Sequence, residues 1–339
     1  MTGPAFRRPA IGLNLHSHLE GSVRPGTAAE FAAGLGVPAP SGGWAAALEM
    51  REPGSLTTFL AHVAHAYPLF GSPEAIYRLV WEAVEDAMLD GQAFLELRFG
   101  PATHASPSMT LRAVVEAASR GLRDASREMG MPAGLVVCAL RHHDLETNRE
   151  VARAAVAFAG QGVVGFDVAG DERLFPSLEP MREPFAIASA AELGLTAHAA
   201  EAGPASAVRD AVELLGVTRI GHGSRVADDP EMLRWAAATG LCLEVCPTSN
   251  VLTAAAPSYE RHPVRAFVDA GCRVVVGDDD PTTTGSRLSE EIGYLGERVG
   301  LDASQVAVIL DTSVDVAFAD VSTRESIRSR LQPAGAPGA

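Results

Sequence analysis

Lysine is absent from this chain of 339 residues, in which all 27 basic side chains are arginines. The absence excludes catalysis through a Schiff-base lysine and excludes phosphate-binding loops that depend on a lysine. Acidic residues outnumber basic ones by 42 to 27, and the formal net charge is −15. Because proteins that bind nucleic acids gather positive charge against the phosphate backbone, a nucleic-acid polymer is not an expected partner.

Cysteine is scarce, and long apolar runs are missing. The four cysteines form no C-x-x-C pair and have no dense spacing, which indicates reduced thiols of an intracellular protein. No segment approaches the run of about 18 apolar residues that crosses a membrane, and the first residues contain no signal-peptide core. The sequence therefore predicts a cytoplasmic protein that binds no membrane.

Short apolar runs recur along the chain, and each is followed by a polar or glycine-rich end and an alanine-rich amphipathic segment. The runs cover residues 11–19, 93–101, 135–143, 163–171, 195–201, 219–226, 242–250 and 273–281. Alternating strands and helices predict parallel strands with crossover helices, and eight such strands predict a (β/α)8 TIM barrel. A doubly wound open sheet is the alternative, although no G-x-G-x-x-G motif follows the first run. We expect a single domain over residues 1–330 and a disordered tail at 331–339.

The interval between the first two runs, residues 20–92, is much longer than the others. It contains SLTTFLAHVAHAYPLF, whose apolar spacing predicts a helix. We expect this insertion after the first strand to cover the C-terminal face of the barrel. His62 and His65 stand at helical spacing within it, so a second metal pair is an alternative to a partly exposed lid helix.

Ionisable residues gather where the predicted strands end. The stretch NLHSHLEG places His16 and His18 at alternate positions of the first strand, so their imidazoles point to the same side. Further ionisable residues follow later strands, namely His198, Glu201, His222 and the aspartates 278–280. Since active sites of TIM barrels form at the C-terminal ends of the strands, these residues are expected to converge there.

The residue types favour one catalytic zinc ion, because magnesium and calcium prefer oxygen ligands alone. The predicted ligands are His16, His18, His198 and one aspartate of 278–280. Bound zinc converts water into a hydroxide nucleophile near neutral pH. Glu201 is placed to exchange a proton with the substrate, and His222 is placed to orient or deprotonate the water. The plain alternative is that these groups are satisfied polar residues at strand ends.

Six ordered segments, NLHSHLEGSVRP, FDVAGDE, HAAEAG, RIGHG, EVCPTSN and GDDDP, resemble the motifs of the adenosine deaminase family of metal-dependent amidohydrolases. They extend from residue 13 to 281 and are highly specific as a set, although each is weak alone. The resemblance implies a zinc-bearing (β/α)8 barrel that hydrolyses the 6-amino group of adenosine, 2′-deoxyadenosine or a close analogue. The products would be ammonia and the inosine-type compound.

The resemblance also implies roles for single residues. Asp279 matches the fourth zinc ligand, Glu201 the residue that protonates ring N1, and His222 the histidine beside the attacking hydroxide. Asp280 matches the aspartate that accepts a hydrogen bond at N7, and Gly170 matches the glycine whose N–H meets N3. An apolar lid over the purine is matched by Leu56, Phe59 and Leu60.

Four positions depart from the family pattern. Glu20 stands where an aspartate usually binds the ribose 5′-hydroxyl, and Gly100 replaces a serine often found near the ribose. Ala200 replaces a glycine, which would narrow the pocket, and Gly277 with Asp278 replaces Asn-Thr, which would add a carboxylate near the metal. None of these removes a catalytic group, so a purine nucleoside or base and water remain the expected partners.

The departures leave the substrate open. Free adenine is one alternative, and a 5′-modified adenosine, such as aminodeoxyfutalosine or an intermediate of secondary metabolism, is another. A non-catalytic binding protein on the same barrel is a third, and the retention of Glu201 and His222 argues against it. The sequence predicts no particular oligomeric state.

Overall fold

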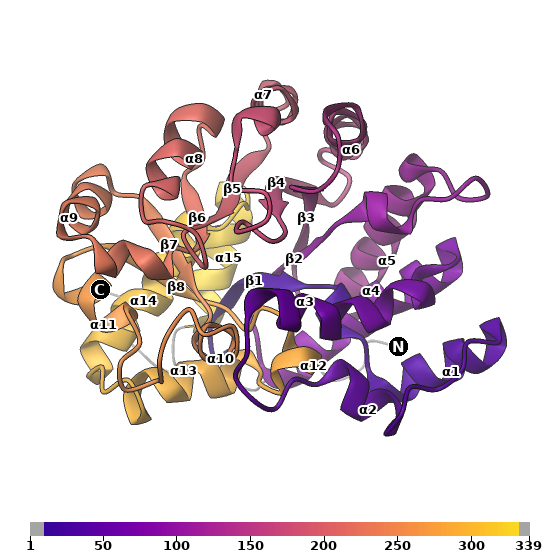
Figure 1. Cartoon of the computed structure of the whole chain (residues 1–339), viewed down its shortest axis with the longest axis horizontal. Helices are drawn as coiled ribbons and strands as arrows, with labels where there is room; N and C mark the ends of the chain where they lie inside the picture. The colour runs from indigo at the N-terminus through magenta and orange to yellow at the C-terminus, as the bar shows by residue number, and fades with distance from the viewer. Residues whose placement is uncertain (1–9, 332–339) are drawn as a thin grey trace.

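The computed structural model describes residues 10–331, and its strands lie side by side in one parallel sheet, in the order β1-β2-β3-β4-β5-β6-β7-β8 (Figure 1). The strands are β1 (Leu13–His18), β2 (Phe94–Phe99), β3 (Ala133–Leu140), β4 (Val163–Ala169), β5 (Gly194–Ala199), β6 (Arg219–His222), β7 (Cys242–Val245) and β8 (Arg273–Val276). The predicted (β/α)8 barrel is confirmed. The doubly wound alternative is wrong, because such a sheet reverses its strand order at a switch point.

The barrel closes between β1 and the residues that follow β8. The N–H of Asp279 donates to the carbonyl oxygen of His16 at 2.9 Å, and the N–H of His18 donates to the carbonyl oxygen of Asp279 at 2.6 Å. These bonds form an isolated parallel bridge between Ser17 and Asp279. Closure therefore depends on the same segment that carries the predicted aspartates.

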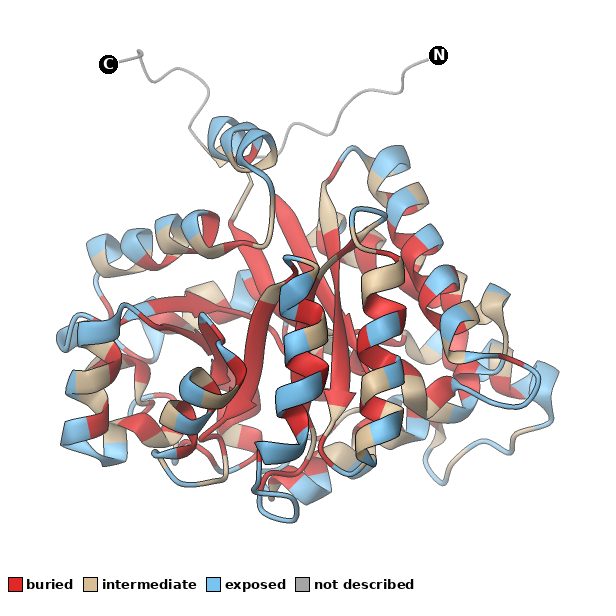
Figure 2. Ribbon diagram, turned by 90° about the horizontal axis from the view of Figure 1, so that it is seen from above, coloured by how far each residue is buried: buried red, intermediate tan, exposed pale blue. Residues whose placement is uncertain are grey.

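Helices surround the barrel and turn their buried faces toward the strands (Figure 2). Those that follow β2 are α5 (Leu111–Met129), α6 (Leu145–Ala157), α7 (Arg182–Ala190), α8 (Ala207–Leu215), α9 (Pro230–Thr239), α10 (Pro247–Leu252), α11 (Val264–Asp269), α12 (Pro281–Thr284), α13 (Leu288–Glu297), α14 (Ala303–Val316) and α15 (Val321–Leu331). Helix α5 shows why such segments form: Thr110 caps its first turn by accepting from the N–H of Ala113, and Gly130 ends it at a φ of 64°.

The long interval between β1 and β2 folds as helices. It contains α1 (Pro25–Leu35), α2 (Gly43–Leu48), α3 (Leu56–Val63), the 3-10 segment η2 (Ala64–Phe70) and α4 (Pro73–Asp90). The helix expected in SLTTFLAHVAHAYPLF is therefore α3 followed by η2. Ser55 begins α3, since its Oγ accepts from the N–H of Thr58 at 3.1 Å. Pro68 lies within η2, where its missing N–H is compatible with a short 3-10 segment but not with a continued α-helix.

Three further expectations concern the run 242–250, the C-terminal tail and membrane-spanning helices. The run 242–250 is not one strand, because β7 ends at Val245 and α10 begins at Pro247, a residue whose fixed φ favours the first helical position. The expected tail lies outside the described residues, except that Leu331 is the last residue of α15. Between residues 10 and 331, no helix is both long enough and apolar enough to span a bilayer.

Candidate active site

A cavity of about 380 Å³ opens at the C-terminal ends of the strands, a size common among small-molecule sites. The predicted site residues that line it are His18, Glu20, Leu56, Phe59, Leu60, Gly170, His198, Glu201, His222, Asp279 and Asp280. His16 is fully buried beside them, with its ring centroid 5.4 Å from that of His18. The fold therefore brings every predicted site residue to one place.

Four of these residues, His16, His18, His198 and Asp279, have ligand atoms within 4.8 Å of one another. Nε2 of His18 lies 3.2 Å from Nε2 of His198, and Oδ1 of Asp279 lies 3.3 Å from Nε2 of His16. That Nε2 atom of His16 is buried and has no hydrogen-bond partner among the described residues. Three imidazoles and one carboxylate that face one point suit a divalent metal with a coordination position left for water.

Carboxylates inside the barrel hold two of these imidazoles from behind. Oε2 of Glu244 lies 2.7 Å from Nδ1 of His16, and Oδ2 of Asp167 lies 3.1 Å from Nδ1 of His198. Arg98 joins the two carboxylates and donates to each at 2.9 Å. Although burial would raise it, the Arg98 guanidinium holds the pKa of Glu244 well below its usual value. Because each Nδ1 is bonded to a carboxylate, Nε2 of His16 and of His198 is the nitrogen left to bind a metal. The four residues His16, His18, His198 and Asp279 are called the metal group below.

Glu201 and His222 lie next to this group, with Oε2 of Glu201 3.7 Å from Nε2 of His222. Burial, followed by the charges of Asp279 and Glu172, raises the pKa of Glu201 well above its usual value. Burial lowers the pKa of His222 well below its usual value. These shifts favour the carboxylic acid form of Glu201 and the neutral form of the His222 imidazole, a combination that suits proton transfer.

The carboxylate of Glu172 holds the loop that carries Glu201. Its Oε1 accepts from the N–H of Ala202 at 2.5 Å and from that of Gly203 at 2.8 Å, and its Oε2 accepts from the N–H of Ala200 at 3.0 Å. Ala200 is fully buried, and the residues that line the cavity do not include it. The expectation that an alanine here narrows the pocket is therefore wrong, because Ala200 is not part of the cavity wall.

The backbone and the glycines of the site are constrained in different ways. Three non-glycine residues have left-handed backbones at strand ends, namely Ala200 (φ 55°), His222 (φ 62°) and Asp279 (φ 61°), and such strain tends to gather at functional sites. Gly221 and Gly21 are instead required by space. A Cβ on Gly221 would lie 3.0 Å from Cε1 of His16, and one on Gly21 would lie 1.9 Å from Oδ1 of Asp280. Without a Cβ at these two positions, the side chains of His16 and Asp280 can pack directly against the backbone of Gly221 and Gly21.

The carboxylate of Glu20 is fixed against the loop that follows β2. Its Oε1 accepts from the N–H of Gly100 at 2.9 Å and lies 3.0 Å from Nε2 of His104. The ring of His104 stacks on Phe70 with centroids 4.0 Å apart. A Cβ on Gly100 would lie 2.9 Å from the side chain of Leu140. The two departures at positions 20 and 100 therefore form one arrangement, in which Oε1 of Glu20 is bonded to the loop while the residue still lines the cavity.

Helix α3 forms an apolar wall of the cavity through Leu56, Phe59 and Leu60. Oγ1 of Thr57 donates to Oδ2 of Asp171 at 2.6 Å, which ties α3 to the loop after β4. His62 lies apart from the metal group, with its Nδ1 2.9 Å from the carbonyl oxygen of Ala47. Among the residues described, neither His62 nor His65 belongs to a group that could hold a metal, which supports the lid helix.

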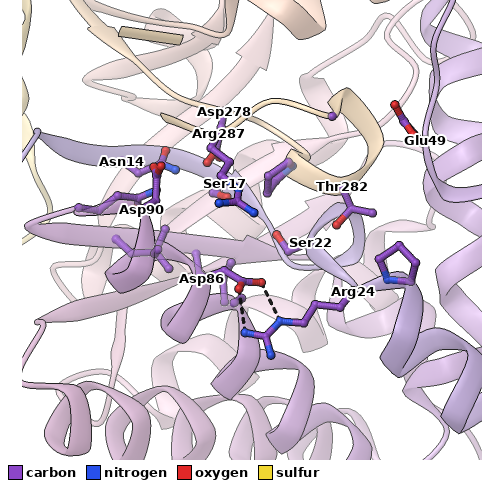
Figure 3. A pocket seen from close by; sticks show the side chains of 18 residues that line it. Asn14, Ser17, Ser22, Arg24, Glu49, Asp86, Asp90, Asp278, Thr282 and Arg287 are labelled. Carbon is purple, nitrogen blue, oxygen red and sulfur yellow. Dashed lines mark hydrogen bonds and ion pairs between the residues drawn. The ribbon is translucent and has the colours of Figure 1, made fainter. Parts of the chain in front are cut away.

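A second cavity, of about 550 Å³, lies between β1, α4 and α12 (Figure 3). Asn14 and Ser17 of β1 line it together with Asp278, and Arg24 crosses it to donate from Nε to Asp86 at 2.9 Å. Asp278 therefore lines this second cavity. It is not a member of the group that could hold a metal, so the added carboxylate that the departure from Asn-Thr implied near the metal is not there. Its neighbour Asp279 lines the active-site cavity instead, from a left-handed backbone with a φ of 61°.

Comparison with known proteins agrees with this geometry. The adenosine deaminase family model matches residues 12–334. The adenosine deaminase of Clostridium perfringens (strain SM101 / Type A) is 32% identical over 320 residues, which are 93% of this chain and 96% of that protein. That of Clostridium botulinum (strain Okra / Type B1) is 29% identical over 325 residues, 94% of this chain and 96% of that protein.

Solved structures share the fold. An adenine deaminase from Arthrobacter aurescens has a TM-score of 0.86 at 24% identity and covers 94% of this chain and 97% of its own. An amidohydrolase from Burkholderia ambifaria with bound Zn has a TM-score of 0.85 at 26% identity, with 97% and 92% covered. Arabidopsis ADAL complexed with IMP has a TM-score of 0.84 at 24% identity, with 94% and 95% covered. Together with the matched motifs, these findings show that the chain belongs to the adenosine deaminase family of hydrolytic deaminases.

Proposed function

We propose that this chain catalyses the zinc-dependent hydrolytic deamination of adenosine or 2′-deoxyadenosine. The 32% identical relative is an adenosine deaminase, which supports a nucleoside substrate. In this reaction water adds across the bond between N1 and C6 of the purine, with its oxygen on C6. The bond from C6 to the exocyclic nitrogen then breaks, and ammonia and inosine or 2′-deoxyinosine are released.

The acidic lining of the cavity is the observation that favours an uncharged nucleoside over a nucleotide as the substrate. Its carboxyl-bearing lining residues are Glu20, Asp171, Glu201, Asp279 and Asp280. Between residues 10 and 331 no arginine lines this cavity, and the chain has no lysine. Even with Glu201 and Asp280 protonated, a phosphate monoester would meet the carboxylates of Glu20 and Asp171 without a cation to pair with, which disfavours nucleotide substrates. The Arabidopsis protein whose structure contains IMP is 24% identical to this chain, a likeness that shows a common fold and carries no argument about the substrate.

Zinc fits the ligand group because three imidazoles and one carboxylate converge there, with His16 and His198 oriented by Glu244 and Asp167. We expect one zinc ion per chain, held by His16, His18, His198 and Asp279. When bound there, zinc would lower the pKa of water and polarise the attacking oxygen. Bound Zn in the 26% identical amidohydrolase supports this metal.

Proton transfer falls to Glu201 in this proposal. Its buried carboxylic acid gives a proton to ring N1, which makes C6 more electrophilic while the water oxygen attacks. Nε2 of His222 lies 3.7 Å from Oε2 of Glu201, so both groups can act on one bound substrate. The presence of both groups disfavours the non-catalytic alternative, since a binding protein needs neither.

The remaining lining residues suit a purine ring. Leu56, Phe59 and Leu60 cover one side of the cavity, and Gly170, at a φ of 110°, brings its backbone to the cavity edge. Adenine N7 has a lone pair and no proton, so Asp280 must donate at N7, not accept as the resemblance first suggests. Burial and the charge of Asp279 raise the pKa of Asp280 well above its usual value, in agreement with a donor.

A panel assay of ammonia release by the zinc-loaded protein tests the proposal. The panel holds adenosine, 2′-deoxyadenosine, adenine, 5′-modified adenosines, AMP, and guanosine and cytidine as controls. We expect the highest kcat/KM with adenosine or 2′-deoxyadenosine and little turnover of AMP. A preference for free adenine or a 5′-modified adenosine would select the alternative substrate. Efficient turnover of AMP would contradict the electrostatic argument, and no turnover of any member would overturn the proposal.

A further inference from the structure

Two buried side chains, those of Asn250 and His262, connect His222 to the backbone N–H of Val264, the first residue of α11. The N–H of Val264 donates to Nδ1 of His262 at 3.1 Å. Nε2 of His262 lies 3.1 Å from Oδ1 of Asn250, and Nδ2 of Asn250 lies 3.0 Å from Nδ1 of His222. His262, Asn250 and His222 are 3%, 0% and 2% exposed, so surrounding water does not compete for these contacts.

The direction of every hydrogen bond in this chain follows from its first member. A backbone N–H can only donate, so Nδ1 of His262 is an acceptor without a proton. A neutral imidazole carries one proton, so Nε2 of His262 has it and donates to Oδ1 of Asn250. With its oxygen facing His262, Asn250 directs its amide nitrogen to His222 and donates to Nδ1. The single proton of neutral His222 must therefore be on Nε2.

We propose that His262, through Asn250, is a positioning residue that sets the tautomer of His222, so that Nε2 of His222 donates a hydrogen bond to the attacking oxygen. Sequence motifs left two roles for His222, to orient the water or to deprotonate it. A nitrogen that already has a proton cannot accept another from water in the neutral ring, so His222 orients the oxygen. With zinc bound, the water would lose its proton to solvent, and the carboxylic acid of Glu201 gives its own proton to ring N1. This inference rests on the proposed function.

Two observations fit the assignment. Burial lowers the pKa of His262 to about 3, so its ring stays neutral and keeps one donor and one acceptor at working pH. His16, His222 and Cys246 form a second group whose ligand atoms lie close enough to hold a metal. Because Nδ1 of His222 accepts from Asn250 and Nε2 is protonated, His222 has no lone pair for a metal ion. Of the two groups found between residues 10 and 331, the tautomer therefore leaves His16, His18, His198 and Asp279 as the one that can bind a metal.

Nitrogen NMR of the zinc-loaded full chain tests the tautomer without any substrate. With 15N-labelled histidine, and the His222 signals identified by their loss in His222→Asn, we expect an unprotonated Nδ1 and a protonated Nε2. A protonated Nδ1 would overturn the inference. Since this measurement needs no turnover, it stands even if the panel assay shows that the proposed substrate is wrong.

Two substitutions at His262 separate positioning from packing. His262→Gln keeps a donor that can reach Asn250 and an acceptor for Val264, whereas His262→Leu keeps bulk and loses both. We expect His262→Leu to lower kcat by about 10–100-fold, with KM little changed and with both tautomers of His222 in its spectrum. His262→Gln should retain most of the activity and the wild-type spectrum. If His262→Leu folds with unchanged kcat, or if both variants lose activity equally, His262 does not set the tautomer.

Discussion

His18 and Asp279 are joined through their backbones, because the N–H of His18 donates to the carbonyl oxygen of Asp279 at 2.6 Å. Their side chains meet as well, with Nε2 of His18 3.5 Å from Oδ1 of Asp279. The N–H of Asp279 bonds in turn to the carbonyl oxygen of His16. The pairing that closes the barrel therefore also fixes the spacing of three side chains of the candidate metal group.

The carboxylates behind the imidazoles should control metal affinity. Asp167→Asn replaces the charged partner of His198 with a neutral amide, and we expect metal affinity to fall by about 10–100-fold. Competition with a chelator measures this directly. Asp86→Asn, at the pair with Arg24 in the second cavity, is the control and should leave metal affinity unchanged. Equal affinities in wild type and Asp167→Asn would contradict an orienting role.

Removal of the metal from the wild type should abolish turnover, and added zinc should restore it.

Glu201→Gln should separate metal binding from proton transfer. The amide keeps the size of the side chain but cannot deliver a proton, so we expect kcat to fall by roughly 10²–10⁴-fold. The metal content, measured by elemental analysis, should equal that of the wild type because Glu201 is not a member of the metal group. A variant with full metal content and an undiminished rate would show that another group transfers the proton.

Glu172→Gln should lower kcat although Glu172 does not line the cavity. The amide cannot accept from all three N–H groups around Glu201, and misplacement of a catalytic group by 1 Å lowers rates by up to about 10²-fold. Gly203→Ala tests the same contact from the other side, since its Cβ would lie 2.8 Å from Oε2 of Glu172.

The matched control for this pair is Glu82→Gln on α4, a buried carboxylate remote from the cavity that accepts from Thr27 and Arg78. It should lower the melting temperature while kcat stays near the wild-type value. If Glu172→Gln and Gly203→Ala also lower only the melting temperature, the contact serves stability alone.

Glu20→Gln should show whether Glu20 contacts the sugar. Its amide oxygen can still accept from Gly100 and His104, but the side chain, which lines the cavity, loses its charge. Loss of a charge-assisted hydrogen bond of about 1.5 kcal/mol or more would lower kcat/KM for adenosine by tenfold or more. Free adenine, which lacks the sugar, is the control substrate and should be affected little. An equal fall for both compounds would mean that Glu20 only supports the cavity wall.

Glu291 should make stability depend on pH. Burial raises the pKa of this α13 carboxyl from 4.5 to about 7. Between these values the unfolded chain loses the proton while the folded protein keeps it, so the free energy of unfolding falls as pH rises toward 7 and then levels off. Glu291→Gln removes this penalty, and its stability relative to wild type should rise by roughly 3 kcal/mol between pH 4 and pH 8.

Urea unfolding at a series of pH values measures the effect of Glu291→Gln. Glu297→Gln, an exposed position at the end of the same helix, is the control and should follow the wild-type curve. Parallel curves for wild type and Glu291→Gln would show that the buried carboxyl does not hold its proton near neutral pH.

Several features were readable from the chain because they are local. The i, i+2 spacing of His16 and His18 requires only an extended strand, and the eight apolar runs require only burial on both faces. The parallel order then brings all strand ends to one side. Residue types at those ends were enough to predict the metal group, Glu201 and His222.

Two charged residues inside apolar runs also indicate buried contacts, although less directly. Arg98 and Glu244 are charged residues within runs that read as buried strands, in AFLELRFGP and CLEVCPTSN. Such residues need partners inside the barrel, since an unpaired buried charge is costly. That Glu244 contacts His16 and that Arg98 joins Glu244 to Asp167 could not be derived, because spacing along one strand says nothing about which side chain of another strand lies opposite.

The sequence alone determined the barrel, its chemistry-bearing strand ends and the family. The tertiary structure decided which of three adjacent aspartates belongs to the metal group, that Ala200 lies outside the cavity wall, and which tautomer His222 adopts through Asn250 and His262. The physical reason is range. Strand and helix periodicity act over a few neighbouring residues, whereas a hydrogen bond between buried side chains depends on distances of about 3 Å between atoms that only the closed barrel brings together.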